Sequence, residues 1–172
     1  MRRKSIESII RVDHAGEYAA VCIYHGQELA LRDTAEVERI REMKRHELEH
    51  FAYFDKALRE RRVRPTVFMP LWHIAAVSLG YVSASLGKEA AMACTEAVEE
   101  VICAHYDEQA KELERCGGDA ELKDMIEQFR EEEREHMEVA ADHGASLAPG
   151  YKVLSHFVKT ACKIGIAISK VL

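Results

Sequence analysis

Four carboxylates and two imidazoles recur in this sequence at a spacing that could hold metal ions. Residues 47–50 and residues 133–136 both read Glu-x-x-His. Residues three apart on a helix lie on one face, one turn apart, so the Glu and the His of each pair can reach the same ion. A lone carboxylate precedes each pair, Glu17 before the first and Glu99 before the second. One such pair is weak evidence because helical surfaces are rich in Glu, and the whole set therefore carries the argument.

A helical hairpin would bring Glu17 beside the first pair. In an antiparallel hairpin, residues at equal distances from the turn lie side by side. The midpoint between Glu17 and Glu47 is Arg32, next to Asp33 and Thr34. We predict that these two residues form the turn and the N-cap of the second helix.

A second hairpin would do the same for Glu99 and Glu133. Their midpoint is Cys116, next to the Gly-Gly-Asp sequence of residues 117–119, which is the clearest turn in the chain. Each hairpin thus places a Glu opposite a Glu-x-x-His, and the two together provide ligands for two metal ions. This set matches the pattern of ferritin-like di-iron carboxylate proteins. The predicted ligands are Glu17, Glu47, His50, Glu99, Glu133 and His136.

The first motif also fits a zinc-peptidase signature, because residues 46–50 read His-Glu-x-x-His. In that interpretation His46 and His50 bind the metal and Glu47 is the base. It explains neither the second Glu-x-x-His nor the two lone carboxylates, so we favour the two-ion interpretation.

The composition supports a helical, globular chain. The sequence has 172 residues, of which 48% are hydrophobic and 31% charged, and it contains only three prolines. We predict one domain over residues 1–172. The net charge of -6 argues against a nucleic-acid binder, and five cysteines without a Cys-x-x-Cys spacing suggest reduced thiols. The N-terminal residues show no secretory signal, and we expect no long transit peptide.

The apolar periodicity predicts an all-α fold, a ferritin-like four-helix bundle with two additional apolar or amphipathic helices. Glu17 lies among apolar positions of the first helix, where a carboxylate is costly to bury unless it is paired or bound. The expected helices cover residues 5–32, 34–62, 70–86, a segment starting near 88, 119–143 and 151–172.

The two additional helices are candidates for membrane contact. Residues 66–87 contain no Asp, Glu, Lys or Arg. The apolar part after Pro70 would be about 24 Å long as a helix, which is shorter than a bilayer core of about 30 Å. We therefore expect a helix that lies at the interface, with a buried core helix as the alternative. The helix over residues 151–172 carries lysines as its only charged residues besides an apolar stripe, which favours membrane-surface contact over ordinary packing.

Several blocks of the sequence resemble the demethoxyubiquinone hydroxylases. Residues 11–18, Arg-Val-Asp-His-Ala-Gly-Glu-Tyr, closely resemble the opening motif of that family, although Ala19 stands where the family often has Gly. Residues 62–72 and 86–100 are similar to its next two blocks. The resemblance covers essentially the whole chain, and several blocks in the right order are more specific than any one motif.

The resemblance implies a di-iron monooxygenase of ubiquinone biosynthesis. Its ligands carry over onto the six residues that the spacing selects, and His105 and Tyr106 match family positions near the metals. The implied cofactors are two Fe ions with bridging carboxylates, O2 as co-substrate, and an external reductant for which NADH is the candidate. One oxygen atom would end on the quinol ring and the other as water.

The resemblance also suggests partners and a location. The substrate would be a prenylated benzoquinol, with peripheral membrane contact through residues 66–86 and 151–172. A homo-oligomer and a ubiquinone-biosynthesis complex both stay open, and no nucleic acid is expected. We expect the cytoplasmic face of a bacterial inner membrane, with the matrix face of the mitochondrial inner membrane as the alternative. Two other functions remain: a ferritin-like di-iron oxidase or peroxidase, and a prenylquinone-binding helical protein without catalysis.

Overall fold

The structure is a computed structural model that describes residues 2–117 and 119–170, with side chains from Ser5 onward. Over these residues the chain forms α-helices, one short 3-10 helix and no strand. The predicted all-α fold is thus confirmed. The elements are α1 (Arg2–Leu31), α2 (Val37–Arg61), α3 (Met69–Ser85), α4 (Lys88–Arg115), α5 (Ala120–Asp142), η1 (Ala145–Leu147) and α6 (Tyr151–Ser169). The last two residues of the predicted final helix lie outside the described residues.

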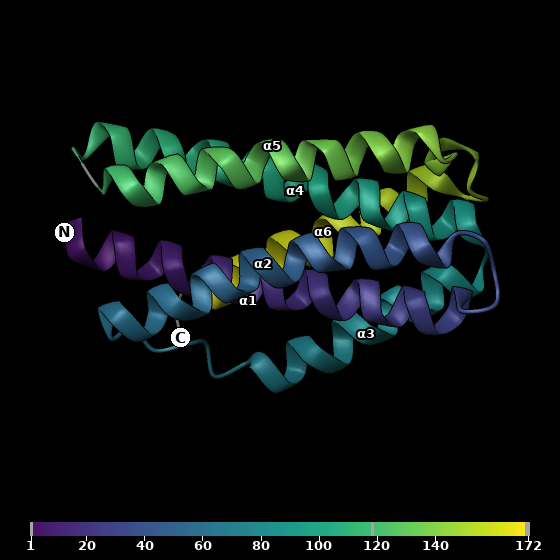
Figure 1. Cartoon of the computed structure of the whole chain (residues 1–172), viewed down its shortest axis with the longest axis horizontal. Coiled ribbons are helices and arrows are strands. Elements are labelled where there is room, and N and C mark those ends of the chain that lie inside the picture. Colours follow the sequence, from purple (N-terminus) through teal and green to yellow (C-terminus); the bar gives the residue numbers. More distant parts are fainter. Residues whose placement is uncertain (1, 118, 171–172) are drawn as a thin grey trace.

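Two hairpins form the bundle. Helix α1 packs on α2 and α4 packs on α5, and Figure 1 shows these four helices lying roughly parallel along the long axis. Helix α3 runs along the outside of α1, and α6 packs mainly on α4. The arrangement is the predicted four-helix bundle with two additional helices.

Two apolar clusters fill the bundle on either side of its middle. One contains Phe54 and Phe129, and the other contains Tyr24 and Met43. On each of the four bundle helices, the predicted carboxylate ligand lies between residues of the first cluster and residues of the second. The apolar packing therefore fixes the axial position of the four carboxylates.

One predicted turn is correct and the other needs a correction. Asp119 caps α5, because its Oδ1 accepts a hydrogen bond of 3.1 Å from the Leu122 backbone N–H. Thr34 does not cap α2. Its hydroxyl instead donates to the Leu31 carbonyl at 2.7 Å, which ends α1, and α2 begins three residues later. A hydroxyl that satisfies the carboxyl end of one helix is not free to cap the next.

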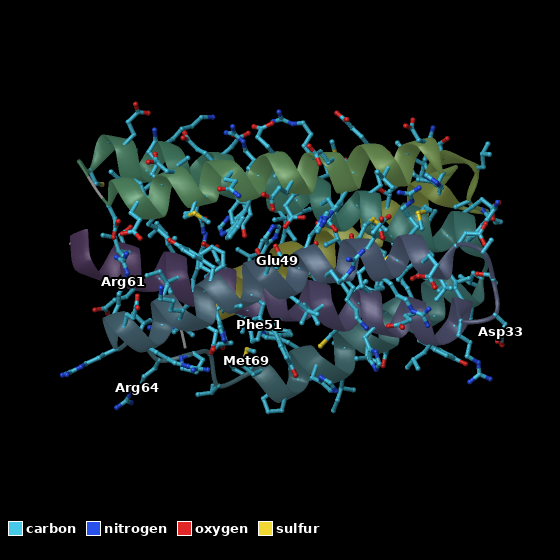
Figure 2. All side chains as sticks on the ribbon, viewed as in Figure 1. Asp33, Glu49, Phe51, Arg61, Arg64 and Met69 are labelled. Carbon is cyan, nitrogen blue, oxygen red and sulfur yellow. The ribbon has the colours of Figure 1, made fainter. Side chains whose placement is uncertain are left out.

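Helix α3 approaches α1 very closely at two glycines. A Cβ added to Gly80 would lie 2.0 Å from the Ile23 carbonyl oxygen, and one added to Gly26 would lie 2.3 Å from the Val77 carbonyl oxygen. Glycine is therefore required at both positions for the backbones to meet. Figure 2 labels Met69 at the start of α3 and Phe51 on α2, and the Phe51 ring contacts the Tyr18 ring with centroids 5.5 Å apart.

The outer faces of α3 and α6 are apolar and exposed. The exposed fractions are 66% for Ile74, 58% for Val82, 62% for Phe157 and 53% for Ile164. The alternative of a buried core helix at residues 70–86 is therefore wrong. Among the described helices, none is both long enough and apolar enough to cross a membrane.

Candidate metal centre

The six predicted ligands meet in the middle of the bundle. Their ligand atoms fall into two groups in which all atoms lie within 4.8 Å of one another. One group is Glu17, Glu47, His50 and Glu133, and the other is Glu47, Glu99, Glu133 and His136. All six side chains are buried. Glu47 and Glu133 belong to both groups, which is the arrangement expected of two ions that share bridging carboxylates.

The histidines present the same nitrogen to the cluster. His50 Nδ1 lies 3.0 Å from Glu133 Oε1 and 3.5 Å from Glu17 Oε2. His136 Nδ1 lies 3.1 Å from Glu133 Oε2 and 3.0 Å from Glu47 Oε1. In both histidines Nδ1 is therefore the candidate ligand atom.

Four buried carboxylate oxygens of this cluster have no hydrogen-bond partner among the described residues: Glu17 Oε2, Glu47 Oε1, Glu47 Oε2 and Glu99 Oε2. A buried polar atom without a partner costs about 1–3 kcal/mol, and a buried charge costs more. Since these oxygens point into one cluster with two imidazoles, the donor set fits cations. Carboxylate and imidazole ligands in this number suit two iron ions.

The electrostatics of the protein alone lead to the same conclusion. Burial raises the pKa of Glu47 and of Glu99 well above the ordinary value, and the charge of Glu133 raises both further. Burial alone would also raise the pKa of Glu133, but hydrogen bonds from His136 and His50 lower it to about 2. The imidazoles thus stabilise the charge of Glu133, whereas Glu47 and Glu99 favour the protonated form unless a positive charge lies beside them.

Two buried tyrosines hold the lone carboxylates. Tyr106 donates a hydrogen bond to Glu17 Oε1, and Tyr24 donates one of 2.8 Å to Glu99 Oε1. Burial raises the pKa of both tyrosines well above the ordinary value, so both hydroxyls keep their protons and act as donors.

His105 lies in a different environment from its neighbour Tyr106. Gln109 Nε2 lies 2.9 Å from His105 Nε2 and donates a hydrogen bond of 2.7 Å to Asp13 Oδ1. Burial and the positive charge of Lys170 lower the pKa of His105 to about 4. His105 is therefore neutral near pH 7 and belongs to a polar chain with Gln109 and Asp13, beside the cluster.

His46 does not occupy the position that a zinc peptidase would require. Its Nδ1 lies 3.0 Å from His136 Nε2, the ring nitrogen directed away from the cluster. His46 and His50 therefore do not converge on one ion, and the His-Glu-x-x-His match has no support in the geometry.

An apolar cavity of about 260 Å³ lies between α1, α3, α4 and α6. Its walls include Gly16 and Ala20 on either side of Glu17, and Val98 next to Glu99. The cavity also reaches Trp72 on α3 and Phe157 on α6. It connects the helices that carry the cluster with the two helices whose outer faces are exposed and apolar.

Comparisons with known proteins agree with this geometry. The family model described as "Ubiquinone biosynthesis protein COQ7" matches residues 4–169. The chain belongs to this family. It is 51% identical over 170 residues to a protein of Dictyostelium discoideum, covering 98% of this chain and 78% of that protein, named "NADPH-dependent 3-demethoxyubiquinone 3-hydroxylase, mitochondrial". It is 46% identical over 167 residues to the "3-demethoxyubiquinol 3-hydroxylase" of Rhodospirillum rubrum, covering 96% of this chain and 77% of that protein. The human protein, which has the same name as the Dictyostelium one, is 44% identical over 98% of this chain and 78% of its own length.

Within this member of the family, sequence reasoning missed three residues that contact the cluster. Tyr24 lies seven residues after Glu17, two helical turns along the same face, and this spacing was the available signal. Glu132 lies in a run of glutamates in which only Glu133 has a histidine three residues later, yet its Oε2 lies 2.6 Å from His50 Nε2. His46 was considered only as a peptidase ligand. Both contacts cross from one helix to another, and no spacing within one helix predicts them.

Proposed function

We propose that this chain is a di-iron, O2-dependent monooxygenase that hydroxylates the ring of demethoxyubiquinol in ubiquinone biosynthesis. The observation that carries the proposal is the buried cluster of four carboxylates and two imidazoles beside an apolar cavity. The printed names of the relatives, which are hydroxylases of this substrate class, support it. We treat residues 1–172 as one catalytic domain.

In this proposal Glu17 and His50 would hold one iron, and Glu99 and His136 would hold the other. Glu47 and Glu133, the members common to both groups, would serve both ions. When reduced, the iron pair supplies the activation of O2 that organic side chains cannot provide. The protein supplies the rest, because the two tyrosine donors and the apolar clusters orient the ligands before the ions bind.

The apolar cavity is the proposed site for the quinol ring. Its walls include the small residues Gly16 and Ala20 near Glu17, and Val98 next to Glu99, so a flat ring bound in this apolar cavity would lie close to the cluster. The isoprenoid tail would leave between α3 and α6, whose exposed faces can contact lipid. Tyr106 and His105 would hold protons near the reaction, Tyr106 as a donor to Glu17 and His105 in its neutral form.

The proposal also includes an external reductant and a location in the cell. The names of the Dictyostelium and human relatives specify NADPH, so we propose a reduced nicotinamide nucleotide, NADPH or NADH, as the external reductant. We propose peripheral attachment to the cytoplasmic face of a bacterial inner membrane, with the matrix face of the mitochondrial inner membrane as the alternative. A homo-oligomer or a larger biosynthetic complex is compatible with the apolar faces.

A single-turnover assay tests the chemistry. The iron-loaded protein is reduced without oxygen, mixed with a demethoxyubiquinol, exposed to 18O2, and the quinone is analysed by mass spectrometry. A product that gains one labelled oxygen supports the proposal. Unmodified quinol with oxidised iron would favour a ferritin-like oxidase, and unmodified quinol with no retained iron would favour a prenylquinone carrier.

Membrane contact needs a separate test. Deleting α6 would remove a wall of the cavity as well as the exposed apolar face. Substitutions on the exposed face of α6 change the membrane contact alone and are therefore the better test. Ile164→Glu together with Val153→Glu should weaken binding to anionic liposomes and lower turnover on long-tailed quinols, while turnover on a short-tailed quinol is kept. Thr160→Glu together with Ala167→Glu, both exposed on α6, adds the same two negative charges and tests whether the large apolar side chains matter. Unchanged liposome binding in the double variant would contradict this contact.

A further inference from the structure

The two ligating histidines have different partners on their outer nitrogens. His50 on α2 places Nε2 2.6 Å from Glu132 Oε2 on α5. His136 on α5 places Nε2 3.0 Å from His46 Nδ1 on α2. Each partner lies four residues before the other histidine, so the two contacts cross between the helices. The two partners occupy equivalent positions on α5 and α2, but one is a carboxylate and the other is an imidazole.

The tautomers follow from the positions of the nitrogens. When Nδ1 of each ring binds an ion, Nε2 carries the proton and donates it outward. Glu132 accepts this hydrogen bond as a carboxylate, and Gln128 Nε2 holds its other oxygen at 2.9 Å. His46 accepts as an imidazole, with its ring within 15° of parallel to that of His136.

The tyrosine donors to the two terminal carboxylates are matched between the halves. Tyr106 donates to Glu17 in one half, and Tyr24 donates to Glu99 in the other. Both terminal carboxylates, like both histidines, are buried. The partner that directly contacts the ligating histidine, in contrast, is a carboxylate in one half and an imidazole in the other.

We propose that Glu132 makes the ion position of Glu17 and His50 the tighter one, so that the first Fe(II) binds there and the second, in the half backed by His46, binds more weakly and exchanges more readily. An anionic acceptor increases the electron-donating strength of the ligating nitrogen more than a neutral acceptor does. Outer partners of this kind change metal affinity about 10–100-fold. The inference rests on the proposed di-iron function, and it assigns Glu132 and His46 as positioning residues.

The test isolates each half in the full chain. Glu99→Ala keeps the half of Glu17 and His50, and Glu17→Ala keeps the other. Anaerobic competition for Fe(II) against a chromogenic chelator should show that the Glu99→Ala protein binds one Fe(II) about 10–100-fold more tightly than the Glu17→Ala protein. Adding Glu132→Gln to the first should remove this advantage, and adding His46→Glu to the second should tighten its site by a similar factor. Glu135→Gln, an exposed charge on the same turn of α5, should leave both affinities unchanged.

A second readout separates positioning from a general effect of charge. With Co(II) as the probe, the visible spectrum of each half-variant should shift only when its own outer partner is changed. Equal Fe(II) affinities in the two half-variants, or equal weakening of both by Glu132→Gln, would overturn the inference while leaving the di-iron function intact. No Fe(II) binding by the unsubstituted chain would instead overturn the proposed function and the inference with it. Circular dichroism checks that each variant is helical. Where an alanine variant is not helical, the corresponding Glu→Gln variant replaces it in the Fe(II) competition.

Discussion

Replacing Glu99 with glutamine should stabilise the metal-free protein while removing a ligand. Glu99 Oε1 accepts a hydrogen bond of 2.8 Å from Tyr24, whereas Oε2 is buried without a partner among the described residues. Burial, with the charge of Glu133, raises the pKa of Glu99 well above its ordinary value of 4.5. A glutamine keeps an acceptor for Tyr24 and carries no charge, so the variant avoids the cost of holding an acid in this site.

The expected size follows from the linkage between proton binding and folding. A carboxyl whose pKa is raised in the folded state destabilises that state as the pH rises above the unfolded value, by at most about 1.4 kcal/mol per pH unit. At about pH 7.5 the limit for Glu99 is therefore about 4 kcal/mol, and at about pH 5 it is below about 1 kcal/mol. We expect the free energy of unfolding of metal-free Glu99→Gln to exceed that of the unsubstituted chain by about 1–4 kcal/mol near pH 7.5, with little gain near pH 5.

Thermal unfolding followed by circular dichroism measures this difference. For a domain of this size about 1 kcal/mol corresponds to about 2–4 °C, so a gain of about 2 kcal/mol raises the midpoint by about 4–8 °C. Anaerobic Fe(II) should stabilise the unsubstituted chain much more than the variant. With Fe(II), the unsubstituted chain should therefore have the higher midpoint of thermal unfolding. Glu108→Gln, an exposed change on the same helix, should neither raise the midpoint of the metal-free protein nor reduce the stabilisation by Fe(II). A metal-free variant that melts below the unsubstituted chain, or a gain of equal size at both pH values, would refute this reasoning.

Three further outcomes are expected. Tyr106→Phe removes the donor to the carboxylate of the first helix and should lower both the affinity for iron and the turnover by about 10–100-fold, as measured by metal content and quinol hydroxylation. Gly80→Ala places a Cβ 2.0 Å from the Ile23 carbonyl oxygen and should cost at least about 1–3 kcal/mol in urea unfolding, whereas Gly16→Ala, with no atom within 4 Å, should be neutral or stabilising. Because the pKa of His105 falls to about 4, the folded state resists a proton that the unfolded chain accepts below about pH 6.5, and stability is lost as the pH falls through this window. His105→Gln should reduce that loss by up to about 3 kcal/mol, and an unchanged pH profile would count against it.

Much of the candidate site could be predicted from helical spacing and turn residues, which are visible in a single sequence. The Glu-x-x-His spacing places two ligands on one helical face, and the two midpoints match the turns between α1 and α2 and between α4 and α5. The cap after the Gly-Gly-Asp sequence was predictable because Asp is a strong N-cap, and the structure confirms Asp119 in that role, while Gly118 lies outside the described residues. The cap of α2 was predicted wrongly, because a threonine hydroxyl can either accept from the amide end of a following helix or donate to the carbonyl end of a preceding one, and Thr34 donates to the Leu31 carbonyl.

Other features depend on how the helices are rotated and shifted against one another. Tyr24 reaches Glu99 across 75 residues of sequence, and Glu132 reaches His50 across 82. These contacts depend on the combined packing of the two apolar clusters, which sets the relative height of four helices at once. The same packing encloses the apolar cavity between α1, α3, α4 and α6.

The sequence by itself determined the residue types of the cluster, their faces on each helix and the pairing of helices into hairpins, because helical periodicity and turn chemistry act over a few residues. Only the tertiary structure decided which outer partner each histidine receives and which faces of α3 and α6 stay exposed. Those outcomes require the angle and the axial shift between helices, and these are set by side chains distant in sequence that must fill one shared interior.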